Sequence, residues 1–128
     1  MRHVNIRDET TYEAPGGRLT KVLVDEATGA KNVMVCHAEL PPGAKSDVHS
    51  REEEEILYVL EGEQVIVTPE GETHRLVSGS LLFIPPGTTH QHTNPYDAPV
   101  RFLGIFSPSA EMGRAIRKRP VAKNPAKR

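Results

Sequence analysis

Two stretches of this sequence place glycine, proline, histidine and acidic residues at fixed intervals. They run Gly43-x5-His49-x-Arg51-x3-Glu55-x6-Gly62 and Gly79-x5-Pro85-x-Gly87-x2-His90-x3-Asn94. Glycine tolerates a positive φ and proline fixes φ, so both residue types are typical of tight turns. The two stretches therefore predict short extended segments, carrying polar side chains, that begin and end at turns.

Short apolar or alternating runs recur along the rest of the chain, with turn residues between them. Eight of these runs are expected to form strands: residues 19–24, 32–40, 56–60, 64–68, 72–76, 80–84, 89–93 and 100–106. Strands at this spacing, without alternating helices, predict an all-β sandwich or barrel. One helix is expected late in the chain, with Ser107 as its N-cap, Pro108 at its first position and residues 109–118 as its body.

The two stretches resemble the paired motifs of the cupin superfamily, G-x5-H-x-H-x3,4-E-x6-G and G-x5-P-x-G-x2-H-x3-N. The spacing agrees at every position, and the resemblance extends over roughly residues 30–106. It implies a small single-domain cupin whose fold is a double-stranded β-helix, or jelly-roll barrel. We expect the barrel over residues 19–106, preceded by an N-terminal arm (1–18) and followed by a C-terminal helix and basic tail (107–128).

The resemblance also implies metal ligands. His49, Glu55 and His90 stand at ligand positions of the family, whereas Arg51 replaces the usual second histidine. A guanidinium is permanently protonated and cannot ligate a metal. Two histidines and one carboxylate still suit a divalent transition metal such as Fe, Mn, Ni or Zn. In the alternative, Arg51 pairs with Glu55 directly and no metal binds.

Strand periodicity extends this hypothesis to the neighbouring residues. If the segment stays extended, its odd-numbered residues share one face, which the resemblance makes the barrel interior, and its even-numbered residues point outward. The inward set is His49, Arg51, Glu53 and Glu55, and the outward set is Ser50, Glu52 and Glu54. Arg51 is then expected to anchor an anionic group of a substrate.

His92 lies two residues after His90 and is expected to point the same way. Its first interpretation is a pocket-lining or surface histidine. Its second is a ligand that completes the coordination that Arg51 cannot provide. In a catalytic site, Glu53 or His92 would move protons.

The charges divide the chain into an acidic body and a basic end. Residues 1–106 carry 9 Lys and Arg against 16 Asp and Glu, while residues 107–128 carry 7 against 1. An acidic body disfavours nucleic-acid binding, which depends on clustered Lys and Arg. The basic end is interpreted as a solvated terminus.

No apolar run reaches 18 residues, and the first residues lack the apolar stretch of a signal peptide, so we expect a cytoplasmic protein without a membrane partner. Cys36 is the single cysteine, which excludes an internal disulfide and fits a reducing compartment. It is expected to be a small buried residue rather than a nucleophile.

Three functions remain open. The leading hypothesis is a metal-dependent enzyme, dioxygenase-like or isomerase- or lyase-like, that acts inside the barrel on a small organic substrate that can be anionic. The second is a metal-free isomerase or cyclase in which Glu53 or Glu55 and His49 or His90 act as acid and base. The third is a non-catalytic ligand-binding or sensor protein. The resemblance also favours a homodimer, formed by exchange of the N-terminal strand.

Overall fold

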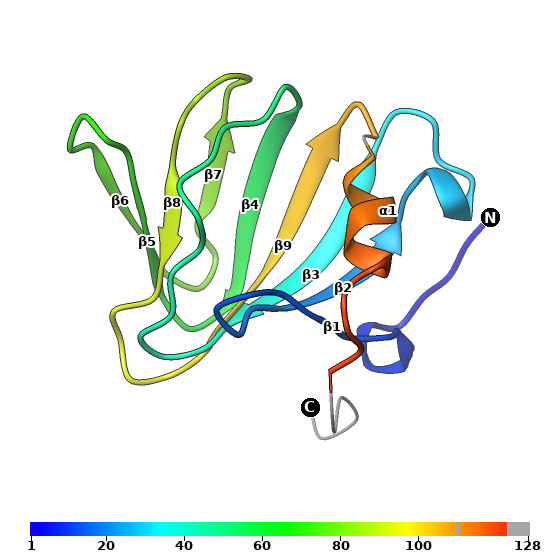
Figure 1. The fold of residues 1–128 in the computed structure, drawn as a ribbon, viewed down its shortest axis with the longest axis horizontal. Coiled ribbons are helices and arrows are strands. Elements are labelled where there is room, and N and C mark those ends of the chain that lie inside the picture. The colour runs from blue at the N-terminus through cyan, green and yellow to red at the C-terminus, as the bar shows by residue number, and fades with distance from the viewer. Residues whose placement is uncertain (110, 123–128) are drawn as a thin grey trace.

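The alternating runs form antiparallel strands in two sheets that face each other (Figure 1). The computed structural model describes residues 1–109 and 111–122. The larger sheet contains, in spatial order, β1 (Tyr12–Glu13), β2 (Leu19–Val24), β3 (Met34–Leu40), β9 (Val100–Ser107), β4 (Glu54–Glu61) and β7 (Leu81–Ile84). The smaller sheet contains β6 (Thr73–Leu76), β5 (Gln64–Val67) and β8 (Gln91–Thr93). The predicted all-β cupin-type jelly roll is confirmed.

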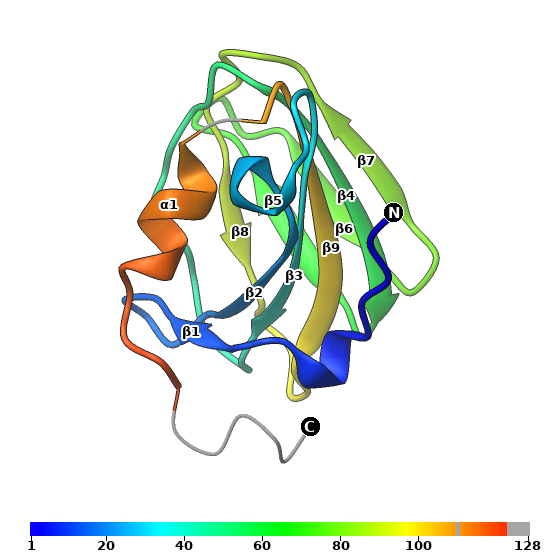
Figure 2. The ribbon, with the colours of Figure 1, turned by 90° about the vertical axis from the view of Figure 1, so that its right-hand side faces the viewer.

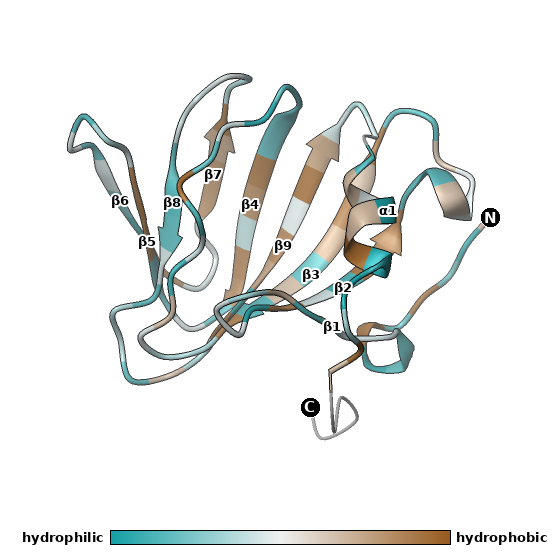
Figure 3. Ribbon diagram, viewed as in Figure 1, coloured by the Kyte–Doolittle hydropathy of each residue, from teal (hydrophilic) through white to brown (hydrophobic). Residues whose placement is uncertain are grey.

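Two short 3-10 helices, Ile6–Asp8 and Glu26–Thr28, lie beside the larger sheet, and one α-helix, α1 (Met112–Arg117), follows β9. Apolar residues concentrate on the strands and on α1, whereas the loops are mostly hydrophilic (Figure 3). Within the described residues, no helix combines the length and the apolar character that crossing a membrane requires.

The inner face of the larger sheet is covered in two parts. One part packs against the smaller sheet and forms an apolar cluster: Ala38, Leu40, Leu57, Val59, Ile66, Leu76, Ile84, Val100 and Phe102. The other part packs against α1 and forms a second cluster: Val22, Met34, Cys36, Phe106 and Ile116. Both clusters use alternate residues of β3 and β9, because successive side chains of a strand point to opposite faces.

The helix begins later than the sequence predicts. Ser107 pairs with Glu54 as the last residue of β9, so it is part of the sheet and does not act as a helix N-cap. The helix starts at Met112 instead. The expectation of a helix with Ser107 as N-cap and Pro108 at its first position is therefore wrong.

The helix is fixed by packing and by charge pairs, and it lies beside β1 and β2, on the side away from β7 (Figure 2). Ile116 is 2% exposed in the second cluster. Arg117 donates to both carboxylate oxygens of the buried Asp25, and Arg114 pairs with Glu26. The basic end is thus not simply solvated as far as residue 122, and residues 123–128 lie outside the described residues.

The segment after α1 joins the N-terminal arm of the same chain. The Glu13 amide donates to Pro120 O at 2.8 Å, and the Ala122 amide donates to Thr11 O at 2.8 Å. β1 pairs with β2 of its own chain. Exchange of the N-terminal strand with a second chain stays a prediction.

Replacing Ile116 with Ala should destabilise the protein by about 2–4 kcal/mol, because it removes a buried side chain that connects α1 to the sheet. Urea unfolding followed by circular dichroism measures this change. Val121→Ala is the control, since Val121 is 59% exposed and its truncation should change stability by less than about 0.5 kcal/mol. Equal stabilities of the two variants would contradict the packing role of α1.

Candidate active site

Three histidines from two segments meet inside the barrel. His49 precedes β4, His90 follows the turn at residues 85–87, and His92 lies on β8. The backbones of His49 and His90 hold each other, with N to O distances of 3.0 and 2.8 Å. One ligating ring nitrogen from each of the three lies within 4.8 Å of the others. The arrangement brings together three atoms that can ligate a metal.

The hydrogen bonds of the rings determine which nitrogen faces the others. His49 Nδ1 lies 2.9 Å from Asp47 O, and His90 Nδ1 lies 2.8 Å from Thr88 O. A carbonyl oxygen only accepts, so each Nδ1 carries the proton and each Nε2 keeps a free lone pair. Both Nε2 atoms are buried and have no hydrogen-bond partner. This tautomer is the one in which a backbone carbonyl orients a metal-ligating histidine.

Glu55 on β4 adds a carboxylate to the cluster. It is 2% exposed, its Oε1 lies 3.6 Å from His90 Nε2, and its Oε2 lies 3.8 Å from His92 Nε2. Both distances exceed a hydrogen bond, and Oε1 has no partner. Burial raises the pKa of Glu55, while the nearby His90 opposes that rise. A buried carboxylate oxygen without a hydrogen bond is costly, and Arg51 Nε at 3.9 Å is too far to donate one, so the position favours a cation between Glu55 and the rings.

The imidazoles of His49 and His92 are held in the neutral form. Burial lowers the pKa of His49 to about 4, and burial together with the charge of Arg18 lowers the pKa of His92 well below its usual range. Neutral imidazoles are the form that ligates metals. The orphaned nitrogens, the orphaned carboxylate oxygen and the neutral rings fit a divalent transition-metal ion.

The structure places the predicted site residues as follows. His49, Glu55 and His90 come together, and His92 joins them as a buried residue that lines the inner cavity. Of its first interpretation, a pocket-lining or surface histidine, the pocket-lining position is confirmed and the surface position is wrong. Arg51 lies beside the cluster, with its Nε 3.9 Å from Glu55 Oε1 and its guanidinium 5.7 Å from the ring centre of Phe106. The Gly87 amide donates to Arg51 O at 2.8 Å, so the turn of the second motif holds the Arg51 backbone.

Glu53 differs from its expected placement. β4 begins at Glu54, and residues 52 and 53 form a bend, so the expectation of one continuous extended segment from His49 to Glu55 is wrong. Glu53 is half-buried and does not line the cavity beside the histidines. The even-numbered residues Ser50, Glu52 and Glu54 are exposed, as predicted.

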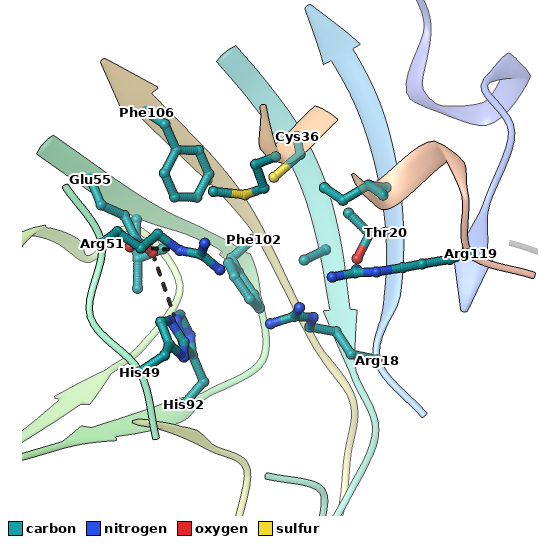
Figure 4. Close-up of a pocket in the computed structure, with 15 residues that line it drawn as sticks. Arg18, Thr20, Cys36, His49, Arg51, Glu55, His92, Phe102, Phe106 and Arg119 are labelled. Atoms are coloured by element: carbon teal, nitrogen blue, oxygen red, sulfur yellow. Dashed lines mark ion pairs between the residues drawn. The ribbon is translucent and has the colours of Figure 1, made fainter. Parts of the chain in front are cut away.

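A cavity extends from the cluster between the two apolar clusters of the core (Figure 4). It has a volume of about 30 Å³, and an outer cavity of about 160 Å³ adjoins it. Four residues line both: Arg18, His49, Arg51 and Arg119. The sequence analysis missed Arg18 and Arg119, because Arg18 lies outside both motifs and Arg119 was assigned to a solvated terminus.

Comparisons with known proteins agree with this geometry. Residues 36–106 match the family described as "Cupin domain". The chain is 32% identical over 115 residues to the tetracenomycin polyketide synthase protein TcmJ of Streptomyces glaucescens, covering 87% of this chain and 75% of that protein.

Two solved structures extend the comparison. The polyketide cyclase RemF from Streptomyces resistomycificus is similar with a TM-score of 0.76 and 26% identity, covering 99% of this chain and 91% of that one. A sugar phosphate isomerase of the cupin superfamily from Silicibacter pomeroyi has a TM-score of 0.71 and 29% identity, covering 83% and 75%.

Cys36 lines the inner cavity and is 6% exposed, which confirms the prediction of a buried thiol. Burial raises its pKa to about 11, so at pH 8 only about one thiol in a thousand is ionised. We expect a thiol-reactive disulfide reagent at pH 8 to label Cys36 only after unfolding in urea. Free cysteine at the same pH is the control, and rapid stoichiometric labelling of the folded protein would contradict this assignment.

Proposed function

The chain belongs to the cupin family, and we propose that it is a metal-dependent enzyme acting on a small organic substrate that extends from the inner cavity into the outer one. One observation carries the proposal. The side chains of His49, His90, His92 and Glu55 converge in a buried space where ring nitrogens and a carboxylate oxygen have no hydrogen-bond partner. A plain binding cavity would not need the buried, neutral imidazoles of His49 and His92 beside a buried carboxylate.

We assign His49, His90, His92 and Glu55 as the metal ligands. Arg51 occupies the sequence position of a ligating histidine but cannot ligate, and His92 supplies the third imidazole from the opposite sheet. A divalent ion held there would act as a Lewis acid on a substrate oxygen. Zn, Fe, Mn and Ni all accept nitrogen and oxygen donors of this kind.

The substrate class we propose is an oxygen-rich, polyketide-type molecule that closes a ring. The named relatives support this class, since one is a polyketide synthase protein and another is a polyketide cyclase. In such a ring closure, a C–H bond beside a carbonyl breaks, the enolate carbon bonds to a second carbonyl carbon, and the proton passes to that carbonyl's oxygen. The enolate and the alkoxide that precede this last proton transfer each carry negative charge on an oxygen.

The residues of this chain suit that chemistry. Arg51 has a fixed positive charge at the cavity wall and would stabilise the enolate oxygen. Phe102 and Phe106 line the same cavity and would exclude water from the reacting atoms. Glu53 has no role in this proposal, because it does not line the cavity.

The proposed metal site is tested by elemental analysis of protein purified without a histidine tag. We expect about one transition-metal ion per chain, reduced at least tenfold in His49→Ala and in His92→Ala because each loses one ligand. His74→Ala is the matched control, since His74 on β6 pairs with Glu72 and is not one of the three clustered histidines, so its loss should leave the metal content unchanged.

Each other result has a defined meaning. Full metal content in His92→Ala would show that His92 is not a ligand. Protein that contains no metal, and takes up none when Zn, Fe, Mn or Ni is added, would contradict the metal site and leave the metal-free cyclase or isomerase, in which Arg51 pairs with Glu55.

We also propose a homodimer formed through the outer face of β4 and β7. Tyr58 and Leu81 pair across these strands, as do Ile56 and Phe83, and Leu81 and Phe83 are 62% and 49% exposed. An apolar row on an edge strand is typical of a surface covered by a partner. A second copy would cover it with the same face, as two-fold symmetry requires.

Light scattering after size exclusion should give twice the chain mass of 14.1 kDa for the native protein and one chain mass for Leu81→Asp. Val121→Asp is the control, because Val121 is also exposed but lies after α1. A monomeric native protein, or a dimer that survives Leu81→Asp, would refute this interface.

A further inference from the structure

Three arginines from distant parts of the chain meet where the two cavities join. Arg18 immediately precedes β2, Arg51 lies before β4, and Arg119 follows α1. All three line both the inner and the outer cavity. Their guanidinium groups point toward one another across the space beside Phe102 (Figure 4).

Several polar atoms at this junction lack hydrogen-bond partners. Arg51 Nε and Arg119 Nη1 are buried donors without an acceptor, and so is the hydroxyl of Thr20, a residue that is 3% exposed and lines the inner cavity. A buried donor without a partner destabilises the folded protein, and it does so more strongly when it is charged. The unsatisfied groups lie on three different segments, so together they indicate a missing acceptor.

The balance of charges at this junction also indicates that an anionic acceptor is missing. Burial and the charge of Arg119 lower the pKa of Arg18, and burial and the charge of Arg51 lower the pKa of Arg119. Among the residues that line the inner cavity, Glu55 is the one acidic side chain, and Asp47 is the one in the outer cavity. Three guanidiniums therefore exceed the nearby carboxylates, and an anion would remove their mutual repulsion.

We propose that Arg18, Arg51 and Arg119, with the Thr20 hydroxyl, form a subsite that binds the carboxylate of a small organic ligand. The guanidinium fork matches the two oxygens of a carboxylate. The inner cavity, at about 30 Å³, has room for one or two water-sized groups and thus for a planar carboxylate rather than a tetrahedral phosphate. The body of the ligand occupies the outer cavity of about 160 Å³.

Arg119 is held at this subsite by backbone pairing. Its neighbour Pro120 accepts from the Glu13 amide, Val121 forms a bridge with Tyr12, and Ala122 donates to Thr11 O. These contacts join the segment after α1 to β1 and to the residue that precedes β1. Through Arg119, the segment that follows α1 therefore forms part of the wall of the ligand site. The subsite needs no metal and goes beyond the proposed metal chemistry.

The test measures binding of benzoate to the full chain by calorimetry, after removal of metal with a chelator and with metal content recorded on the same samples. Benzoate should bind, and its neutral isostere benzamide should bind at least tenfold more weakly, because the arginines recognise the charge. Arg119→Gln and, separately, Arg18→Gln should each weaken benzoate binding at least about tenfold. Arg75→Gln is the control, since Arg75 pairs with Glu63 on the surface.

Melting temperatures without ligand separate a binding role from a structural one. Removing one of three repelling charges should leave the melting temperature of Arg119→Gln and Arg18→Gln unchanged or higher, whereas the loss of a structural contact would lower it. Equal binding of benzoate and benzamide, or undiminished binding in both variants, would overturn the proposal. Binding of inorganic phosphate without binding of benzoate would overturn the carboxylate class. The binding and melting measurements are made on metal-free protein. They therefore test the carboxylate subsite even if the elemental analysis finds no metal.

Discussion

Burial of a carboxylate at the centre of the barrel is the constraint around which the rest of the site is arranged. Glu55 is nearly inaccessible to solvent, on a strand whose next inward residues belong to the apolar core. A charge in such a place requires compensation by cations or donors. The Nε2 atoms of His49 and His90 have no hydrogen-bond partner. The Nε2 atoms of His90 and His92 lie 3.6 and 3.8 Å from the carboxylate oxygens, which is too far for a hydrogen bond. The space between them is thus suited to a metal ion.

The motif residues serve this arrangement mostly through backbone geometry. Gly62 has a φ of 85° and lies so close to the Pro99 carbonyl that a side chain there would collide with it. Asn94 is buried and donates to Leu40 O and Ala98 O at 2.9 Å. The first contact brings the end of β4 close to the start of β9, and the second joins the segment after β8 to the end of β3. The spacing of the motifs reflects the requirements of turns as much as those of ligands.

Positive charge at the cavity mouth is a second feature of the same site. Arg51 lies between the histidine and carboxylate cluster and the other arginines, since it is near Glu55 and lines both cavities. It cannot ligate, and His92 provides the imidazole that the first motif lacks. A substitution within one motif is thus matched by a side chain on the opposite sheet. In the proposed function, a metal at one side of the site would act as a Lewis acid, and the arginines at the other side would bind an anion.

The strand pattern follows from the sequence alone, because turns and alternation are local properties, and the resemblance of the two motifs to the cupin superfamily implied the jelly roll and the proximity of His49, Glu55 and His90. Tertiary structure decided the rest. The start of α1 depends on the pairing of Ser107 with Glu54, and the positions of Arg18 and Arg119 depend on contacts between chain ends about 100 residues apart. No local pattern encodes such contacts, since burial of a charged residue depends on which distant groups surround it.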